Sequence, residues 1–149
     1  MGVRVVNRQE VMPVEPRLLE ALAGAGTRAL ELIASRGLAR GDVPGEAVIS
    51  LVDDVMIAEV HGQYMDDPTP TDVITFPYGE TGDILISVET AERQRGDYEN
   101  SWEQELALYL VHGLLHLCGH DDREEGERRR MDELQSTLVK EVFSTGGAS

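Results

Sequence analysis

The feature of this sequence that most restricts its fold is an apolar helical segment near the C-terminal end of the chain. A helix is predicted over about residues 101–118, and from residue 106 onward its apolar positions leave no continuous polar stripe. Ser101 and Gln104 have the spacing of a capping box and mark where this helix begins. A helix without a polar face must be buried on most sides, so the rest of the chain has to fold around it.

The rest of the chain alternates short β-branched segments with helical ones. Strands are predicted at residues 3–7, 47–52, 73–76 and 84–88, and helices at about 16–36, after the cap Asp53, and at about 123–143. The tail at 144–149 is expected to fray. This alternation predicts an α/β (α+β) fold with four strands. A chain of 149 residues can bury a core of its own, so we expect a single domain over residues 1–149.

Two histidines, His112 and His116, lie inside the apolar helix. Their spacing places both imidazoles on one face, one turn apart, close enough to bind one ion. Gly119 then ends the helix and lets the chain turn back, which brings His120, Asp121 and Asp122 toward the same point. This order and spacing are those of the zinc ligands in metzincins, and a carboxylate oxygen is an accepted zinc ligand. His112, His116 and Asp122 are therefore candidate ligands of one metal ion.

The same residues also have a plain structural interpretation. A buried histidine is usually a core residue with a satisfied hydrogen bond, and pairs at helical spacing arise by chance. Two imidazoles in a buried helix, followed by a helix-ending glycine and a carboxylate, favour the metal site, because buried polar groups need partners. Gly113 stands where a metallopeptidase would carry a glutamate, which weakens a peptidase mechanism.

Charge and composition restrict the partners that this chain can bind. It has 28 Asp and Glu against 13 Lys and Arg, a net charge of −15, which argues against a broad basic surface for nucleic acid. No Lys or Arg occurs between Arg40 and Arg93, so a polyanion would approach another face or be held through a metal ion. We expect no membrane segment, because no apolar run is long enough. The single cysteine, Cys118, fits a cytoplasmic protein and is expected to be a buried thiol.

Three segments together resemble one known family. Residues 112–122, HGLLHLCGHDD, resemble the signature of the YbeY family of metal-dependent endoribonucleases. Residues 70–77, PTDVITFP, and 82–84, GDI, resemble two further segments of that family, and order and spacing match from about residue 48 to residue 142. The resemblance implies a compact fold in which helices pack on a small mixed sheet, with a zincin-like helix that carries the metal site.

The sequence departs from the family pattern at two places. Asp122 stands where the signature ends in a histidine, and His120 stands at an aromatic position. Either Asp122 replaces the third imidazole or His120 becomes the substitute third ligand, and the position of Asp122 after the glycine favours Asp122. Family members often carry a catalytic arginine after the tyrosine that precedes PTDV. Here Met65 follows Tyr64, so that role is not carried over.

The resemblance also implies a function. The family resemblance implies that this protein is a metal-dependent endoribonuclease that cuts single-stranded RNA in ribosomal RNA maturation and ribosome quality control. We expect one Zn²⁺ per chain, or another divalent metal, with His112, His116 and Asp122 acting through the ion and its water. The expected partners are ribosomal RNA and the small ribosomal subunit or its proteins. Two alternatives stay open: a non-catalytic ribosome-assembly factor with a structural metal, and a metallopeptidase-like hydrolase.

Several polar residues near these segments have two interpretations each. Asp121 would orient a metal ligand or satisfy the turn, and Thr71 and Asp72 would line a substrate groove or stabilise a turn before a strand. The arginines at the start of the last helix could contact RNA, but the glutamates between them make a solvated helix face the simpler interpretation. These arginines are Arg123, Arg128, Arg129 and Arg130.

Overall fold

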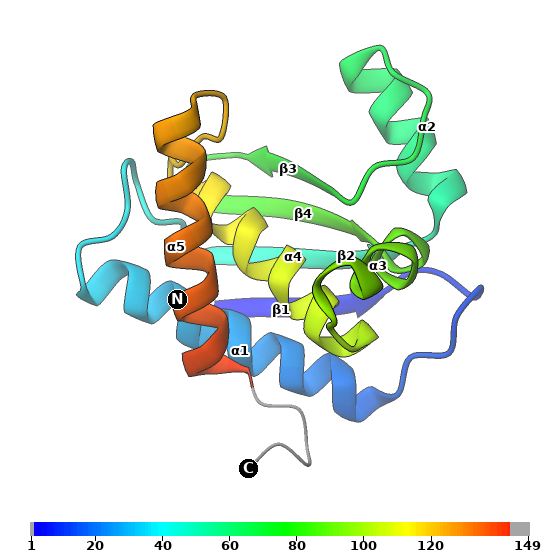
Figure 1. The fold of residues 1–149 in the computed structure, drawn as a ribbon, viewed down its shortest axis with the longest axis horizontal. Helices are drawn as coiled ribbons and strands as arrows, with labels where there is room; N and C mark the ends of the chain where they lie inside the picture. Colours follow the sequence, from blue (N-terminus) through cyan, green and yellow to red (C-terminus); the bar gives the residue numbers. More distant parts are fainter. Residues whose placement is uncertain (1, 144–149) are drawn as a thin grey trace.

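The structure, a computed structural model, describes residues 2–143 and contains one four-stranded sheet with helices packed on it (Figure 1). In chain order the elements are β1 (Gly2–Asn7), α1 (Pro16–Ser35), β2 (Glu46–Val52), α2 (Asp54–Met65), β3 (Val73–Pro77), β4 (Thr81–Ser87), α3 (Val88–Gln94), the 3₁₀ helix η1 (Arg95–Tyr98), α4 (Trp102–Leu117) and α5 (Glu125–Val142). The expected α+β class is confirmed.

The sheet is mixed, as the family resemblance implied. Its strand order is β1-β2-β4-β3, with β1, β2 and β4 parallel and the edge strand β3 antiparallel to β4. The side chains of β4 alternate between the two faces. Ile84 and Ile86 point into the main core, whereas Leu85 packs on the opposite face near Ile57 of α2.

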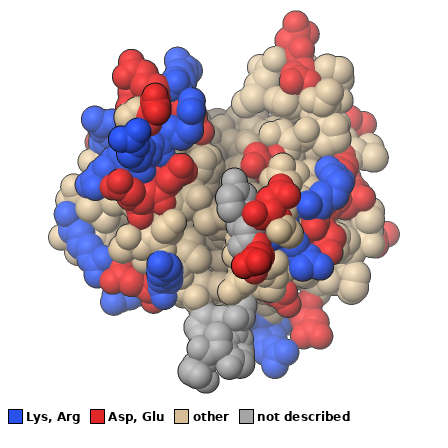
Figure 2. All heavy atoms as spheres, viewed as in Figure 1, with Lys and Arg blue, Asp and Glu red and all other residues tan. Residues whose placement is uncertain are grey.

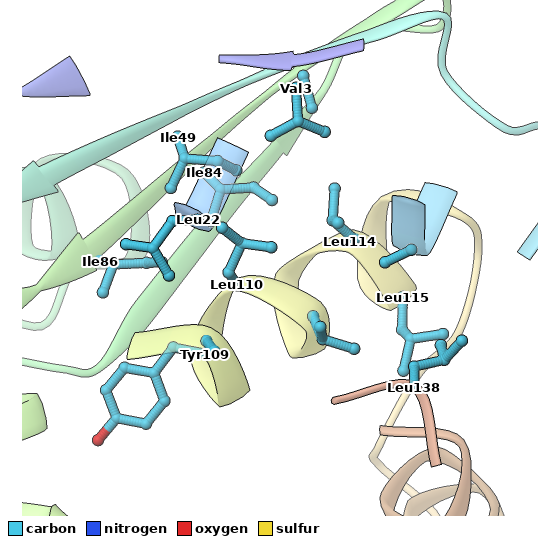
Figure 3. Close-up of a cluster of buried hydrophobic side chains, with 14 of the residues drawn as sticks. Val3, Leu22, Ile49, Ile84, Ile86, Tyr109, Leu110, Leu114, Leu115 and Leu138 are labelled. Carbon is cyan, nitrogen blue, oxygen red and sulfur yellow. The ribbon is translucent and has the colours of Figure 1, made fainter. Parts of the chain in front are cut away.

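Helix α4 lies across the main-core face of the sheet, and its apolar residues are buried as expected. Leu110 and Leu114 point toward Ile84 of β4 (Figure 3). Gly113 faces the same strand, and a Cβ atom at this position would lie 2.9 Å from two carbon atoms of Ile84. The absence of a side chain at residue 113 therefore lets α4 approach the sheet closely. None of the helices in the described part of the chain has the length and apolarity needed to cross a membrane.

Helix α5 covers the outer side of α4. Its buried residues are Met131, Leu134 and Leu138, and Leu138 lies beside Leu115 of α4 in Figure 3. This packing places one face of α5 next to the histidine face of α4. The tail at residues 144–149, predicted to fray, lies outside the described residues.

The sequence analysis was wrong about the segment after β4. The predicted strand 84–88 begins earlier, at Thr81, and ends at Ser87, because Ser87 caps the unpredicted helix α3 by accepting a hydrogen bond from the Thr90 N–H at 3.2 Å. Asp54, at the start of α2, also holds α3 in place. Its carboxylate accepts hydrogen bonds from Ser87 at 2.7 Å, Thr90 at 2.8 Å and Arg93 at 2.6 Å. These contacts link residues more than thirty positions apart, which a local pattern cannot reveal.

Candidate metal centre

The three predicted metal ligands meet at the C-terminal half of α4. The Nε2 atoms of His112 and His116 are 3.0 Å apart, and the Asp122 Oδ2 atom is 3.8 Å from each of them. The side chains are partly exposed, at 27%, 24% and 44% respectively. Each can therefore offer one ligand atom to an ion that enters from solvent. Among the described residues, these three form the group that could hold a metal ion.

A turn at Gly119 positions Asp122. Gly119 has a φ of +97°, and a Cβ atom there would lie 2.6 Å from the Gly41 nitrogen and 2.9 Å from the Arg40 carbonyl carbon. The backbone N–H groups of Arg40 and Gly41 both donate to the Cys118 carbonyl oxygen at 2.9 Å. The turn is therefore held against the connection between α1 and β2, where only glycine fits without strain.

Hydrogen bonds fix the orientation of both imidazole rings. His112 Nδ1 lies 2.7 Å from Gln135 Oε1 on α5, and His116 Nδ1 lies 3.0 Å from the His120 carbonyl oxygen. Because each partner is an oxygen acceptor, we assign the proton of each neutral ring to Nδ1. The Nε2 lone pairs of both rings then face each other and Asp122.

This arrangement fits a divalent cation. Two nitrogen lone pairs at 3.0 Å repel each other unless a proton or a cation lies between them. Burial, together with the adjacent His112, lowers the pKa of His116, so its ring favours the neutral form that binds metal. The three separations of 3.0, 3.8 and 3.8 Å bracket the value of about 3.3 Å expected between two ligands of a tetrahedral zinc ion.

The other residues predicted near the centre lie in different places. The His120 ring is buried and its Nε2 is 2.7 Å from the Leu38 carbonyl oxygen, so it points away from the group and Asp122 is favoured as the third ligand. Asp121 does not contact either imidazole. Its carboxylate accepts the Asp122 backbone N–H at 2.7 Å and lies 3.3 Å from Arg123, so it holds the backbone of the ligand residue.

Cys118 is buried, as expected, and its burial raises the thiol pKa to about 11. The thiol is therefore protonated at neutral pH, and Cys118 does not belong to the group of residues whose ligand atoms lie close enough together to hold one ion.

A groove of about 680 Å³ begins beside His112 and runs between α4 and α5. Figure 2 shows this face of the molecule hollowed between the α5 side and the α3 side. Asp72 lines the groove, and its carboxylate accepts the Val73 backbone N–H at 2.8 Å. Thr71 is not among the lining residues; its hydroxyl lies 3.4 Å from Asp72 Oδ1. Asp72 thus both caps the start of β3 and faces the groove.

The sequence analysis missed the polar residues of the groove. Gln135, which orients His112, lies on the face of α5 that packs on α4. It is one turn after the buried Met131, and a polar residue at that spacing on an apolar face indicates a polar partner on the neighbouring helix. Tyr109 and Glu105 of α4 also line the groove. Burial and the nearby negative charges raise the pKa of Tyr109, whose hydroxyl donates to Gln94 Oε1. Tyr109 is therefore a neutral hydrogen-bonding group.

Fold and site together define the class of this protein. It is an α+β protein in which a buried helix and the turn after it present two histidines and an aspartate at one end of a groove, an arrangement typical of zincin-like metal-dependent hydrolases. The family model described as "Endoribonuclease YbeY" matches residues 6–142. The chain belongs to this family.

Curated relatives and one solved structure agree with this assignment. "Endoribonuclease YbeY" of Petrotoga mobilis is 34% identical over 148 residues, which cover 96% of this chain and 96% of the relative. The proteins of the same name from Carboxydothermus hydrogenoformans and Pelotomaculum thermopropionicum are 34% and 38% identical, with 91% and 88% of this chain and 93% and 90% of the relatives covered. The solution structure of TM1509 from Thermotoga maritima is 30% identical, with a TM-score of 0.61 over 94% of this chain and 88% of that chain.

Proposed function

We propose that this protein is a zinc-dependent endoribonuclease that cuts single-stranded RNA in ribosomal RNA maturation and ribosome quality control. The observation that carries the proposal is the meeting of two Nε2 atoms and one carboxylate at the end of a groove, in a chain that belongs to the YbeY family. We further propose that it works in the cytoplasm on ribosomal RNA, together with the small ribosomal subunit or its proteins.

His112, His116 and Asp122 would hold the ion. When bound, a divalent cation supplies Lewis-acid chemistry, because it makes a coordinated water more acidic and offsets negative charge on a phosphate. The two imidazoles keep their protons on Nδ1 and direct their lone pairs inward, through Gln135 and the His120 carbonyl. Asp122 contributes a negative charge, so this centre has a lower net positive charge than one with three neutral histidines.

The groove is suited to an extended substrate. Its lining combines amide and carboxylate groups with the partly exposed aromatic ring of Phe143. Bases of a single strand can stack on an aromatic ring and form hydrogen bonds with amides, which a paired duplex cannot do. A single-stranded segment is therefore the form of RNA that this groove would accept.

The proposal is tested with a defined RNA oligonucleotide, single-stranded or annealed to its complement. The purified protein should cut the single strand, lose this activity in a chelator and regain it with Zn²⁺. His116→Ala should lower the cleavage rate by at least about a hundredfold, because it removes a ligand atom. Cleavage that survives both chelation and His116→Ala contradicts the proposal.

The same preparation separates the two alternatives. Gly113 packs against Ile84, so the position of a peptidase glutamate is occupied by a helix–sheet contact. We therefore expect no cleavage of an unstructured peptide. If neither RNA nor peptide is cut while chelation lowers the melting temperature, the metal is structural and the protein is a non-catalytic assembly factor.

A further inference from the structure

We propose that Arg128 is a phosphate-binding residue of the active centre, which contacts the phosphodiester that lies beside the metal ligands. This inference rests on the proposed function, because it names the group that holds the RNA backbone at the same site. Its ligand class is a phosphodiester, or a free phosphate anion.

The position of Arg128 is set by the residue that supplies the third metal ligand. The Arg128 Nε–H donates to the Asp122 carbonyl oxygen at 3.2 Å. The guanidinium is thus attached to the backbone of Asp122, while the Asp122 carboxylate points toward the histidines. A guanidinium bound through Nε keeps its two terminal amino groups for another acceptor. Within residues 2–143, no carboxylate forms an ion pair with Arg128.

Two of the neighbouring arginines, Arg123 and Arg129, are already paired. Arg123 lies 3.3 Å from Asp121, Arg129 lies 3.4 Å from Glu125, and a glutamate of α5, Glu127, is 3.7 Å from Arg40. Figure 2 shows this mixture of both charges over the N-terminal part of α5. Arg130 lines a separate hollow beside His120, which points away from the metal ligands. Arg128 therefore differs from the other arginines of this region by its contact with the ligand residue.

The helix places Arg128 on the functional face of α5. Arg128, Asp132, Gln135 and Val139 follow the spacing i, i+4, i+7 and i+11, so they form one stripe. The last three line the groove, and Gln135 holds His112. Arg128 thus extends the groove-lining stripe of α5 toward its N-terminal end, where its Nε contacts Asp122.

Charge complementarity favours a phosphate at this end. The groove itself carries Asp72, Glu105 and Asp132 against the single cation Lys140, so its interior repels a phosphodiester. A planar guanidinium binds two oxygens of one phosphate at once and stays charged at any pH that the protein tolerates. A strand whose phosphate lies between Arg128 and the metal ligands could place its bases, which are uncharged, in the groove.

The test compares Arg128→Ala with Arg129→Ala, two adjacent arginines of which only the first contacts Asp122. In single-strand cleavage, Arg128→Ala should lower kcat/KM about tenfold or more, and Arg129→Ala less than about twofold. Arg128→Lys keeps the charge but loses the planar fork, so it should restore only part of the rate. Equal losses in the two alanine variants overturn the proposal.

A second readout does not need cleavage. In a chelator, binding of a fluorescent single-stranded RNA by the full-length chain is measured at several salt concentrations. Arg128→Ala should weaken binding and reduce the slope of log K against log salt by about 0.7, because one phosphate contact is lost. Arg129→Ala should leave this slope unchanged.

Zinc affinity and the melting temperature separate a phosphate contact from a structural one. Both should be unchanged in Arg128→Ala, and a loss of zinc affinity would show that Arg128 only holds Asp122, which overturns the proposal. If Arg128→Ala weakens RNA binding but the unaltered protein does not cut the RNA, the proposed function fails while the phosphate contact stands. Inorganic phosphate should compete with the RNA for the protein less effectively in Arg128→Ala than in Arg129→Ala. Equal competition in the two variants also contradicts the contact.

Discussion

The hydrogen bond between His112 Nδ1 and Gln135 Oε1 decides which nitrogen of the His112 ring faces the other ligands. Without this acceptor, the neutral ring can carry its proton on Nε2 instead, and that tautomer cannot bind a cation at the shared point. The motif on α4 predicted the two histidines and Asp122, which the structure brings together. It could not predict Gln135, because the two partners are 23 positions apart in the chain and a turn and the start of another helix lie between them.

Gln135→Ala should therefore weaken zinc binding about 10- to 100-fold, because outer partners of a ligating histidine fix its tautomer and orientation. The measurement is competition for Zn²⁺ against a chromophoric chelator, with the melting temperature of the metal-free protein as a check on folding. Ser136→Ala is the matched control, because Ser136 also lines the groove but does not contact His112. Equal zinc affinities of the two variants would contradict the role of Gln135.

Among the structural elements, the turn between α4 and α5 contributes most to the site. Helix α4 and its capping box were predictable because the apolar pattern and the Ser101–Gln104 spacing are local signals, and the structure contains both hydrogen bonds of the box. Helix α3 was not predictable, because Asp54 of a different helix supplies its anchoring contacts. The turn between α4 and α5 was predictable only in part. Its glycine is a local signal in the sequence, but the position of the turn depends on hydrogen bonds from the Arg40 and Gly41 backbone.

Gly119→Ala should lower the free energy of unfolding by at least about 2 kcal/mol, because Gly119 combines a positive φ with a backbone clash at 2.6 Å. It should also weaken zinc binding, since the turn carries Asp122. The matched control is Gly126→Ala in α5, where an added Cβ meets nothing within 4 Å and should change stability by less than about 1 kcal/mol. Chemical denaturation and zinc competition measure both effects; similar results for the two variants would contradict this account of the turn.

At the scale of the whole molecule, the sheet, α4 and α5 form successive layers (Figure 1), and the metal ligands lie on α4 and in the turn that follows it. The position is a compromise between packing and chemistry. The histidines are on the most buried helix, so their rings lose part of their hydration, and this burial lowers the pKa of His116. Sequence alone indicated a buried helix with two histidines, but the depth of each ring depends on α5, whose register on α4 is a tertiary contact.

The lowered pKa of His116 makes the stability of the metal-free protein depend on pH. The unfolded chain binds the His116 proton near the ordinary value of 6.5, while the folded chain binds it only at lower pH, so unfolding takes up a proton between these two values. The free energy of unfolding should therefore fall as the pH decreases below about 6.5. Carboxylates with lowered pKa, such as Asp54 and Glu141, contribute a further loss only below about pH 4.5.

Urea denaturation of the chelated protein at several pH values from 7 to 5 measures this slope. His116→Asn should reduce it, because the substitute does not titrate, whereas a substitution at the solvent-exposed Arg17 should leave it unchanged. Saturating Zn²⁺ should stabilise the original protein most at the upper end of this range, since a protonated imidazole cannot bind metal. A slope that is the same in the original protein and in His116→Asn would show that burial of this ring does not link the metal centre to the stability of the fold.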